Sequence, residues 1–107
     1  MLEVIGAVSA AIAIGACAFG AHGASGQAAE WLRTGGFYQL IHAVAVVLLA
    51  KQASGPSAML LAGSVVFAAT LYLMAIGAPR WLGAITPIGG LLMIAGWLWL
   101  AWQFARR

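Results

Sequence analysis

Residues 52–79 read QASGPSAMLLAGSVVFAATLYLMAIGAP, and no charged side chain interrupts them. Three more uncharged runs flank this one: Val4–Ala29 and Thr34–Ala50 before it, and Trp81–Ala105 after it. A helix needs about 20 apolar residues to cross a bilayer, and each run approaches or exceeds that length. The four runs occupy nearly all of the 107 residues. The sequence therefore predicts a single membrane domain, residues 1–107, with four spans.

The composition excludes several classes of soluble protein. Hydrophobic residues make up 64% of the chain and charged residues 7%, whereas soluble domains carry roughly 25% charged residues. The basic residues lie between or after the uncharged runs, where membrane topology accounts for them, so we expect no nucleic-acid partner. One cysteine, Cys17, cannot form an intrachain disulfide. A cytosolic enzyme, a nucleic-acid-binding domain and a disulfide scaffold are all disfavoured.

Local signals place the four spans at about residues 2–21, 36–51, 57–77 and 87–104. Ser54-Gly55-Pro56-Ser57 is typical of a tight turn, and Thr86-Pro87 is typical of an N-cap followed by a proline at the first helical position. The most polar stretch follows the first span and predicts a short interfacial helix anchored by Trp31. The expected fold is therefore all-α: an integral membrane four-helix bundle with a short interfacial helix between the first two spans.

The basic residues predict the orientation. An even number of spans places both termini on one side of the membrane, together with Lys51, Arg106 and Arg107. Arg33 and Arg80 lie on the opposite side. The positive-inside rule then favours cytoplasmic termini.

Small residues recur at helical spacing in the first span. Ala7, Ala11, Gly15 and Ala18 predict a face that allows another helix to approach closely, either within the chain or in a homo-oligomer. His22 continues this stripe, so we expect its imidazole to point toward protein rather than lipid.

Three separated motifs resemble one known family. They are AFGAHG at residues 18–23, TGGFYQLIHA at 34–43 and WLGAITPIGG at 81–90. In this order they closely resemble the small membrane proteins of the domain of unknown function 423 family, which includes the transmembrane protein 256 group of animals. That family tends toward FSGSLY where this chain has FAATLY at residues 67–72, which argues against a role for a serine pair there. The resemblance implies a multi-pass membrane protein, in bacteria an inner-membrane protein, and implies no biochemical activity.

Polar residues within the spans are the candidate functional residues, because such groups are costly inside a membrane. We expect them to gather in the outer half of the bilayer. One interpretation is structural: they hydrogen-bond between helices, and His22 caps the first helix. The other is a path for a proton, an ion or a small solute. The two histidines differ in depth, so we expect no metal or other cofactor. The members of this cluster are His22, Tyr38, Gln39, His42, Tyr72 and Thr86.

Two functional hypotheses follow. The first is a non-enzymatic membrane protein with a structural, lipid-related or partner-binding role, in contact with membrane lipids. The alternative is a small transporter or channel that uses the polar cluster. Small multidrug-resistance transporters use a carboxylate within their first helix, and this chain has no acid between Val4 and Ala29. Its only carboxylates, Glu3 and Glu30, lie near membrane surfaces, so we predict no catalytic residues and no enzymatic activity.

Overall fold

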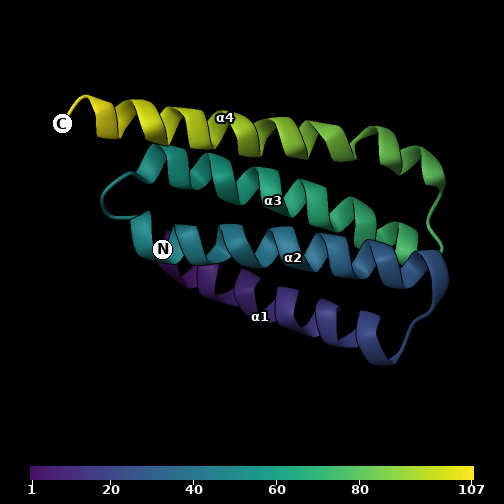
Figure 1. Cartoon of the computed structure of the whole chain (residues 1–107). Helices are drawn as coiled ribbons and strands as arrows, with labels where there is room; N and C mark the ends of the chain where they lie inside the picture. Colours follow the sequence, from purple (N-terminus) through teal and green to yellow (C-terminus); the bar gives the residue numbers. More distant parts are fainter.

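The computed structural model describes all 107 residues as four long antiparallel helices (Figure 1). They are α1 (Leu2–His22), α2 (Gly26–Leu49), α3 (Ser54–Ala75) and α4 (Thr86–Ala105), with one 3-10 turn, η1 (Arg80–Ala84), before α4. Each long helix is apolar and long enough to cross a membrane. The predicted all-α fold with four membrane helices is confirmed.

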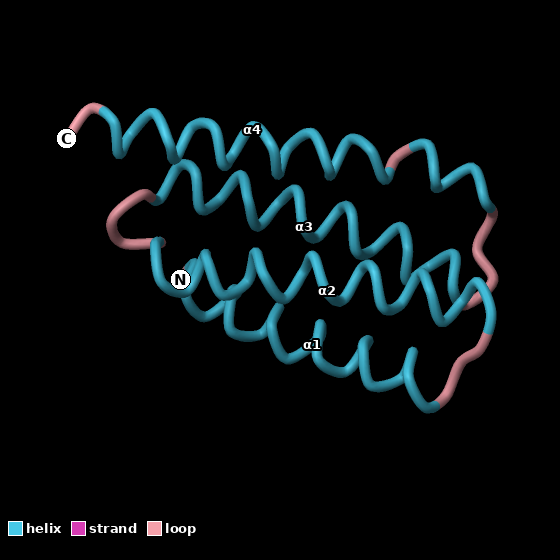
Figure 2. The backbone as a smooth tube through the Cα atoms, in the orientation of Figure 1, coloured by secondary structure: helices cyan, strands magenta, loops and turns pink.

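The helices pack in chain order. Figures 1 and 2 show α2 and α3 lying between α1 and α4, and each helix contacts the next along the chain. The backbone of α4 contacts neither α1 nor α2, while α1 also touches α3. Buried residues make up 39% and 44% of the most apolar stretches of α2 and α3, against 22% of the corresponding stretch of each outer span. The pairs α1–α3 and α2–α4 are therefore less closely packed than helices that are adjacent in the chain.

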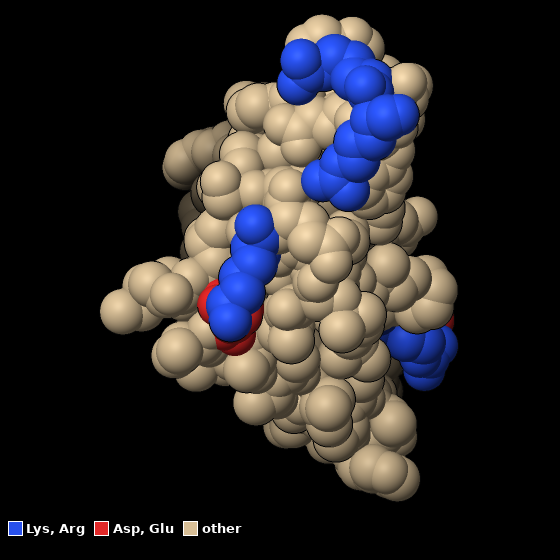
Figure 3. All heavy atoms as spheres, turned by 90° about the vertical axis from the view of Figure 1, so that its left-hand side faces the viewer, with Lys and Arg blue, Asp and Glu red and all other residues tan.

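Charged residues lie at the two ends of the molecule. Figure 1 shows both termini and the α2–α3 connection at one end, and Figure 3 shows lysine and arginine side chains around that end. Here Lys51 Nζ lies 3.7 Å from Glu3 Oε2, and the Arg107 guanidinium donates to the carbonyl of Gln52 at 3.1 Å. At the other end, Arg33 pairs with Glu30 at 3.2 Å. The helices between these ends are uncharged, as a membrane-spanning region requires.

The separate interfacial helix between the first two spans was a wrong prediction. Residues 26–49 form one continuous helix, so Trp31 lies within the second turn of α2. Gly35 and Gly36 are poor helix formers in isolation, yet both are buried: a Cβ on Gly35 would lie 2.8 Å from Tyr72, and one on Gly36 would collide with Cys17. Packing against the neighbouring helices therefore outweighs the local propensity to break.

The predicted turn at residues 54–57 also differs from the structure. The α2–α3 connection is residues 50–53, and α3 already begins at Ser54. Pro56 lies in the first turn of α3, where the missing N–H removes no helical hydrogen bond. The helix ends at Ala75, shortly before Gly77, whose φ of 106° is incompatible with continuing the helix.

The α3–α4 pair crosses at two glycines. A Cβ on Gly63 would lie 2.8 Å from the Gly89 carbonyl oxygen, and a Cβ on Gly89 would lie 2.5 Å from the Phe67 nitrogen. Only glycine allows the two backbones to approach this closely. This crossing holds α4 on α3 and fixes which α4 side chains reach across toward α2.

The predicted small-residue face of the first helix does not pack within the chain. Ala7, Ala11, Gly15 and Ala18 are exposed, and a Cβ on Gly15 would meet no atom within 4 Å. The buried face of α1 instead contains Gly6, Ser9, Ala13 and Gly20. Small residues follow both faces of α1, so spacing alone could not identify the one that contacts α2.

Candidate functional site

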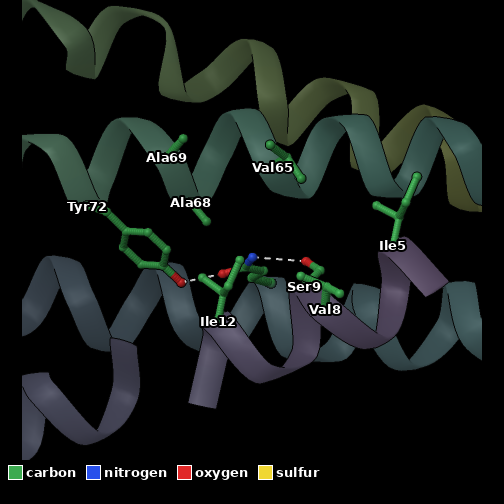
Figure 4. A pocket seen from close by; sticks show the side chains of 9 residues that line it. Ile5, Val8, Ser9, Ile12, Val65, Ala68, Ala69 and Tyr72 are labelled. Carbon is green, nitrogen blue, oxygen red and sulfur yellow. Dashed lines mark hydrogen bonds between the residues drawn. The ribbon is translucent and has the colours of Figure 1, made fainter. Parts of the chain in front are cut away.

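The first candidate site is the α1–α3 groove, a hollow of about 260 Å³ between α1 and α3 with α2 beneath it (Figure 4). Its walls are almost entirely aliphatic, and the polar side chains lie at its base. Figure 4 shows Ser9 on α1 and Tyr72 on α3 reaching toward each other from opposite walls. The lining residues are Ile5, Val8, Ser9, Ile12, Gln39, Val65, Ala68, Ala69 and Tyr72.

A hydrogen-bonded chain joins three helices across this groove. The Tyr72 hydroxyl donates to Gln39 Oε1 at 2.5 Å, and Gln39 Nε2 donates to Ser9 Oγ at 2.9 Å. Ser9 and Gln39 are each only 4% exposed. Interhelical hydrogen bonds of this kind contribute about 0.6 kcal/mol each on average in a membrane protein. The chain thus ties α1, α2 and α3 together by polar contacts within an apolar bundle.

The second candidate site is the α2–α4 groove, a hollow of about 370 Å³ on the other side of α3. Aromatic rings from α2, α3 and α4 line this groove. The Tyr38 ring lies edge-on to Phe67 with centroids 5.0 Å apart, and the His42 and Trp97 rings lie 5.8 Å apart. The lining residues are Tyr38, His42, Phe67, Gly90, Met93, Ile94 and Trp97.

Both ring nitrogens of His42 are occupied. Nδ1 lies 2.6 Å from the Tyr38 carbonyl oxygen, which can only accept, so Nδ1 carries the proton. The Trp97 indole N–H then donates to Nε2 at 2.9 Å. A second proton on His42 would face this indole N–H and break the bond. The geometry therefore favours the neutral imidazole and a role in joining α2 to α4.

A third polar contact lies near the start of α4. The hydroxyls of Thr70 and Thr86 are 2.6 Å apart and share a hydrogen bond, and Thr86 Oγ1 also lies 3.4 Å from the Leu82 carbonyl oxygen. Thr86 was predicted to cap α4, but the helix has no side-chain cap, because this hydroxyl is turned toward α3 and η1. Pro87 does lie in the first turn of α4, as expected.

The predicted cluster is therefore divided. Gln39 and Tyr72 lie in one groove, Tyr38 and His42 in the other, and Thr86 bonds with Thr70. His22 joins none of them.

The expectation that His22 faces protein is corrected. Its side chain is exposed and makes no hydrogen bond, and α1 ends instead with the Gly23 N–H bonded to the Phe19 carbonyl. His22 follows the small-residue stripe of α1, as its spacing indicated, but that stripe faces away from the bundle.

Three hydrogen-bonding partners were missed in the sequence. Ser9 is the only hydroxyl-bearing residue of α1, and that isolation was a usable signal. Trp97 stands with Trp99 and Trp102 in a pattern typical of an interfacial aromatic belt, although it precedes the C-terminal end of α4 by two turns. Thr70 gave no signal, since threonine often bonds its own helix, as it does here to the Phe67 carbonyl at 3.0 Å. No group of three metal-binding side chains occurs in the structure.

The sequence is similar to a family of bacterial membrane proteins. The family described as "Protein of unknown function (DUF423)" matches residues 16–90. A UPF0382 membrane protein of Staphylococcus haemolyticus is 37% identical, and the match covers 91% of this chain and 88% of the relative. The UPF0382 membrane protein YwdK of Bacillus subtilis is 36% identical, with 89% and 88% covered. That of Haemophilus influenzae is 37% identical, with 85% and 81% covered. No solved structure matches the chain significantly.

These relatives share the length and membrane character of this chain, and their names describe no biochemical activity. The three motifs that suggested the resemblance all lie within the matched residues 16–90: at the end of α1, inside α2 and across the η1–α4 junction. The chain belongs to the DUF423 family of small, functionally uncharacterised membrane proteins.

Proposed function

We propose that the protein has a non-enzymatic, structural and lipid-related role in the bacterial inner membrane. One observation carries this proposal: most of the buried polar side chains of the bundle are hydrogen-bonded within the protein. Ser9, Gln39, His42 and Thr70 are all buried and hydrogen-bonded. Among the buried side chains, only the Ser57 hydroxyl lacks a partner. Polar groups arranged in this way hold helices together.

The same geometry opposes the transporter alternative. A transport path needs polar or ionisable groups that remain free to bind a solute as it crosses. Here the two groove systems lie on different sides of α3, both nitrogens of His42 are occupied, and no carboxylate lies between the charged ends. These features support the structural and lipid-related role.

Measurement of flux through the reconstituted protein distinguishes the structural role from transport. In liposomes, we expect proton and solute flux at the level of empty vesicles for both the wild type and His42→Ala. We also expect His42→Ala to lower the unfolding temperature in detergent, because it removes the contact with Trp97. His22→Ala is the matched control and should leave that temperature unchanged, since His22 makes no hydrogen bond. Wild-type flux that His42→Ala abolishes would contradict the proposal.

We further propose cytoplasmic termini. The terminal end carries Lys51, Arg106 and Arg107, and the opposite end carries Arg33 and Arg80, so the basic excess favours a cytoplasmic position for the terminal end. The test uses single cysteines in a Cys17→Ala background. Ser54→Cys at the terminal end should resist an impermeant thiol reagent added outside intact cells, and Ser25→Cys at the other end should react. The reverse pattern would overturn this orientation.

Self-association through α1 stays a prediction. The exposed small residues Ala7, Ala11, Gly15 and Ala18 would allow a second copy to approach closely. Ala11→Ile should then convert any dimer to monomer, as measured by light scattering of the detergent-solubilised protein. An unchanged mass would exclude this face as an interface.

A further inference from the structure

Two arginines at the end of α4 have no acidic partner. The ion pairs of the protein involve Lys51 and Arg33, whereas neither Arg106 nor Arg107 lies within salt-bridge distance of a carboxylate. Both side chains are exposed. Figure 3 shows a group of basic side chains at the top of the terminal end, where α4 ends, with no acidic atoms beside them. This pair of arginines, the α4 corner, therefore carries positive charge that the chain itself does not neutralise.

Aromatic rings hold both guanidinium groups in place. The Arg106 guanidinium lies 4.1 Å from the centroid of the Trp102 ring, and that of Arg107 lies 5.1 Å from the centroid of Phe104. Contacts of this kind attract a cation to the ring face. Arg107 also donates one N–H to the Gln52 carbonyl at 3.1 Å. Arg106 donates no side-chain hydrogen bond within the protein, so its planar group is positioned while all five N–H donors stay free.

The α4 corner lies at the level of the lipid phosphates. Helix α4 spans Thr86–Ala105, 20 residues, which is about 30 Å at 1.5 Å per residue. This length matches the hydrocarbon core of a bilayer, about 30 Å thick. Arg106 follows the last residue of the helix directly. Its guanidinium therefore lies where the hydrocarbon core meets the headgroups.

An apolar surface leads from this corner into the membrane. Leu91, Ile94, Leu98 and Trp102 are each more than half exposed. They recur every three or four residues, so they share one side of α4, and Arg106 continues the series four residues beyond Trp102. The buried residues of α4 lie on its other side. This surface, the α4 strip, thus combines aliphatic side chains, an indole ring and a guanidinium in the order in which a phospholipid presents its tail and its phosphate.

We propose that the α4 corner binds an anionic phospholipid, with Arg106 holding the phosphodiester, Arg107 adding a second positive charge and an acyl chain lying along the α4 strip. This inference deepens the lipid-related role proposed above and rests on it. A guanidinium binds a phosphate group through two parallel N–H···O bonds, which suits the free donors of Arg106.

Charge complementarity selects this occupant. Water and uncharged lipids bring no charge opposite to that of the two arginines. A zwitterionic phospholipid has a phosphate, but it also carries a cation that the arginines repel, whereas anionic lipids attract basic residues at the membrane surface. A soluble phosphate ion would meet the corner and leave the α4 strip uncovered. Only an anionic phospholipid matches both the charge and the apolar surface next to it.

Native mass spectrometry of the full chain in detergent tests the proposal. The protein receives equal amounts of phosphatidylglycerol and phosphatidylcholine with the same acyl chains, and the bound lipids are identified by mass. We expect phosphatidylglycerol to be preferred. Arg106→Gln should weaken its binding about fivefold, which corresponds to about 1 kcal/mol for one basic residue near an anionic lipid surface. The phosphatidylcholine adducts should not change.

Two further variants separate a local site from a general effect of charge. Arg80→Gln is the matched control: it also removes one exposed arginine that lies over a tryptophan, here Trp31 at 5.6 Å, but at the opposite end of the molecule. It should leave the preference unchanged. Arg106→Lys should retain part of the preference, because lysine keeps the charge and lacks the planar fork.

Three results would overturn the inference. They are equal binding of the two lipids by the wild type, equal loss of phosphatidylglycerol in Arg106→Gln and Arg80→Gln, and displacement of the bound lipid by inorganic phosphate at the same concentration. The flux experiment is separate from all three. Equal lipid binding with background flux would remove this inference and leave the structural role, whereas flux that depends on His42 would remove the proposed role whatever lipid is bound.

Discussion

The two grooves beside α3 each contain a tyrosine, and they differ in what happens to its hydroxyl. In the α1–α3 groove, Tyr72 donates to Gln39, and Gln39 donates to Ser9, so the polar groups form a chain within the protein. In the α2–α4 groove, the Tyr38 hydroxyl has no partner, and the neighbouring His42 and Trp97 bond each other. The same residue type joins helices through its hydroxyl in one groove and makes no such bond in the other.

Helix spacing accounts for this difference. Buried glycines let α1 approach α2 closely: a Cβ on Gly6 would lie 3.1 Å from Val46, and one on Gly20 would lie 3.1 Å from Leu32. A short side chain such as Ser9 therefore reaches Gln39. The backbones of α2 and α4 do not meet, so only long rings bridge them. Close packing brings hydroxyl groups within reach of partners on the next helix, whereas wide spacing leaves a hydroxyl unpaired.

The largest effect is expected where α4 crosses α3. In Gly89→Val the new Cβ would lie 2.5 Å from the Phe67 nitrogen and 2.6 Å from the Gly63 carbonyl oxygen, and neither backbone atom can move aside easily. We expect a loss of about 3 kcal/mol of unfolding free energy, at the upper end of the usual range for overpacking. Unfolding in detergent by a chemical denaturant measures it.

The adjacent glycine supplies the control for this substitution. Gly90→Ala adds its methyl group to open space and should change the unfolding free energy little. Equal destabilisation by both substitutions would contradict the assignment of Gly89 to the crossing and of Gly90 to the α2–α4 groove.

Much of the fold was predictable from the sequence because the physics of the bilayer acts on local composition. The lack of charge in four runs of helix-compatible length predicts four membrane helices, and the charged residues mark their ends. The errors arose where long-range packing decides the outcome. The sequence predicts that the second span starts only at residue 36. In the structure the helix continues through this point, because Tyr72 and Cys17 pack against Gly35 and Gly36 of α2.

The candidate site was predictable as a set of residues and not as an arrangement. Five of the six predicted side chains do lie at helix contacts or grooves, because polar groups in a membrane must find partners. Which partner each one finds depends on helix rotation, which spacing within one helix does not report. His22 and Ser9 illustrate this: the sequence stripe selected His22, and the structure buries Ser9 on the other face of α1.

The second-largest loss of unfolding free energy is expected from the hydrogen bonds of the α1–α3 groove. Gln39→Leu removes two interhelical hydrogen bonds and leaves the hydroxyls of Ser9 and Tyr72 unpaired. With about 0.6 kcal/mol per bond on average and up to about 1.7 kcal/mol in the strongest cases, we expect a loss of about 1–2 kcal/mol. Gln27→Leu, at the exposed start of α2, is the control and should have little effect. A stable Gln39→Leu protein would mean that this chain does not hold the three helices together.

The smallest effect compares the two tyrosines directly. Tyr72→Phe removes one donor bond to Gln39 and should cost about 0.6 kcal/mol of unfolding free energy in detergent. Tyr38→Phe removes a hydroxyl that bonds nothing in the chain, so it should leave the stability unchanged or raise it slightly. Equal loss of unfolding free energy in the two variants would contradict this difference between the grooves, because only the Tyr72 hydroxyl donates to another helix.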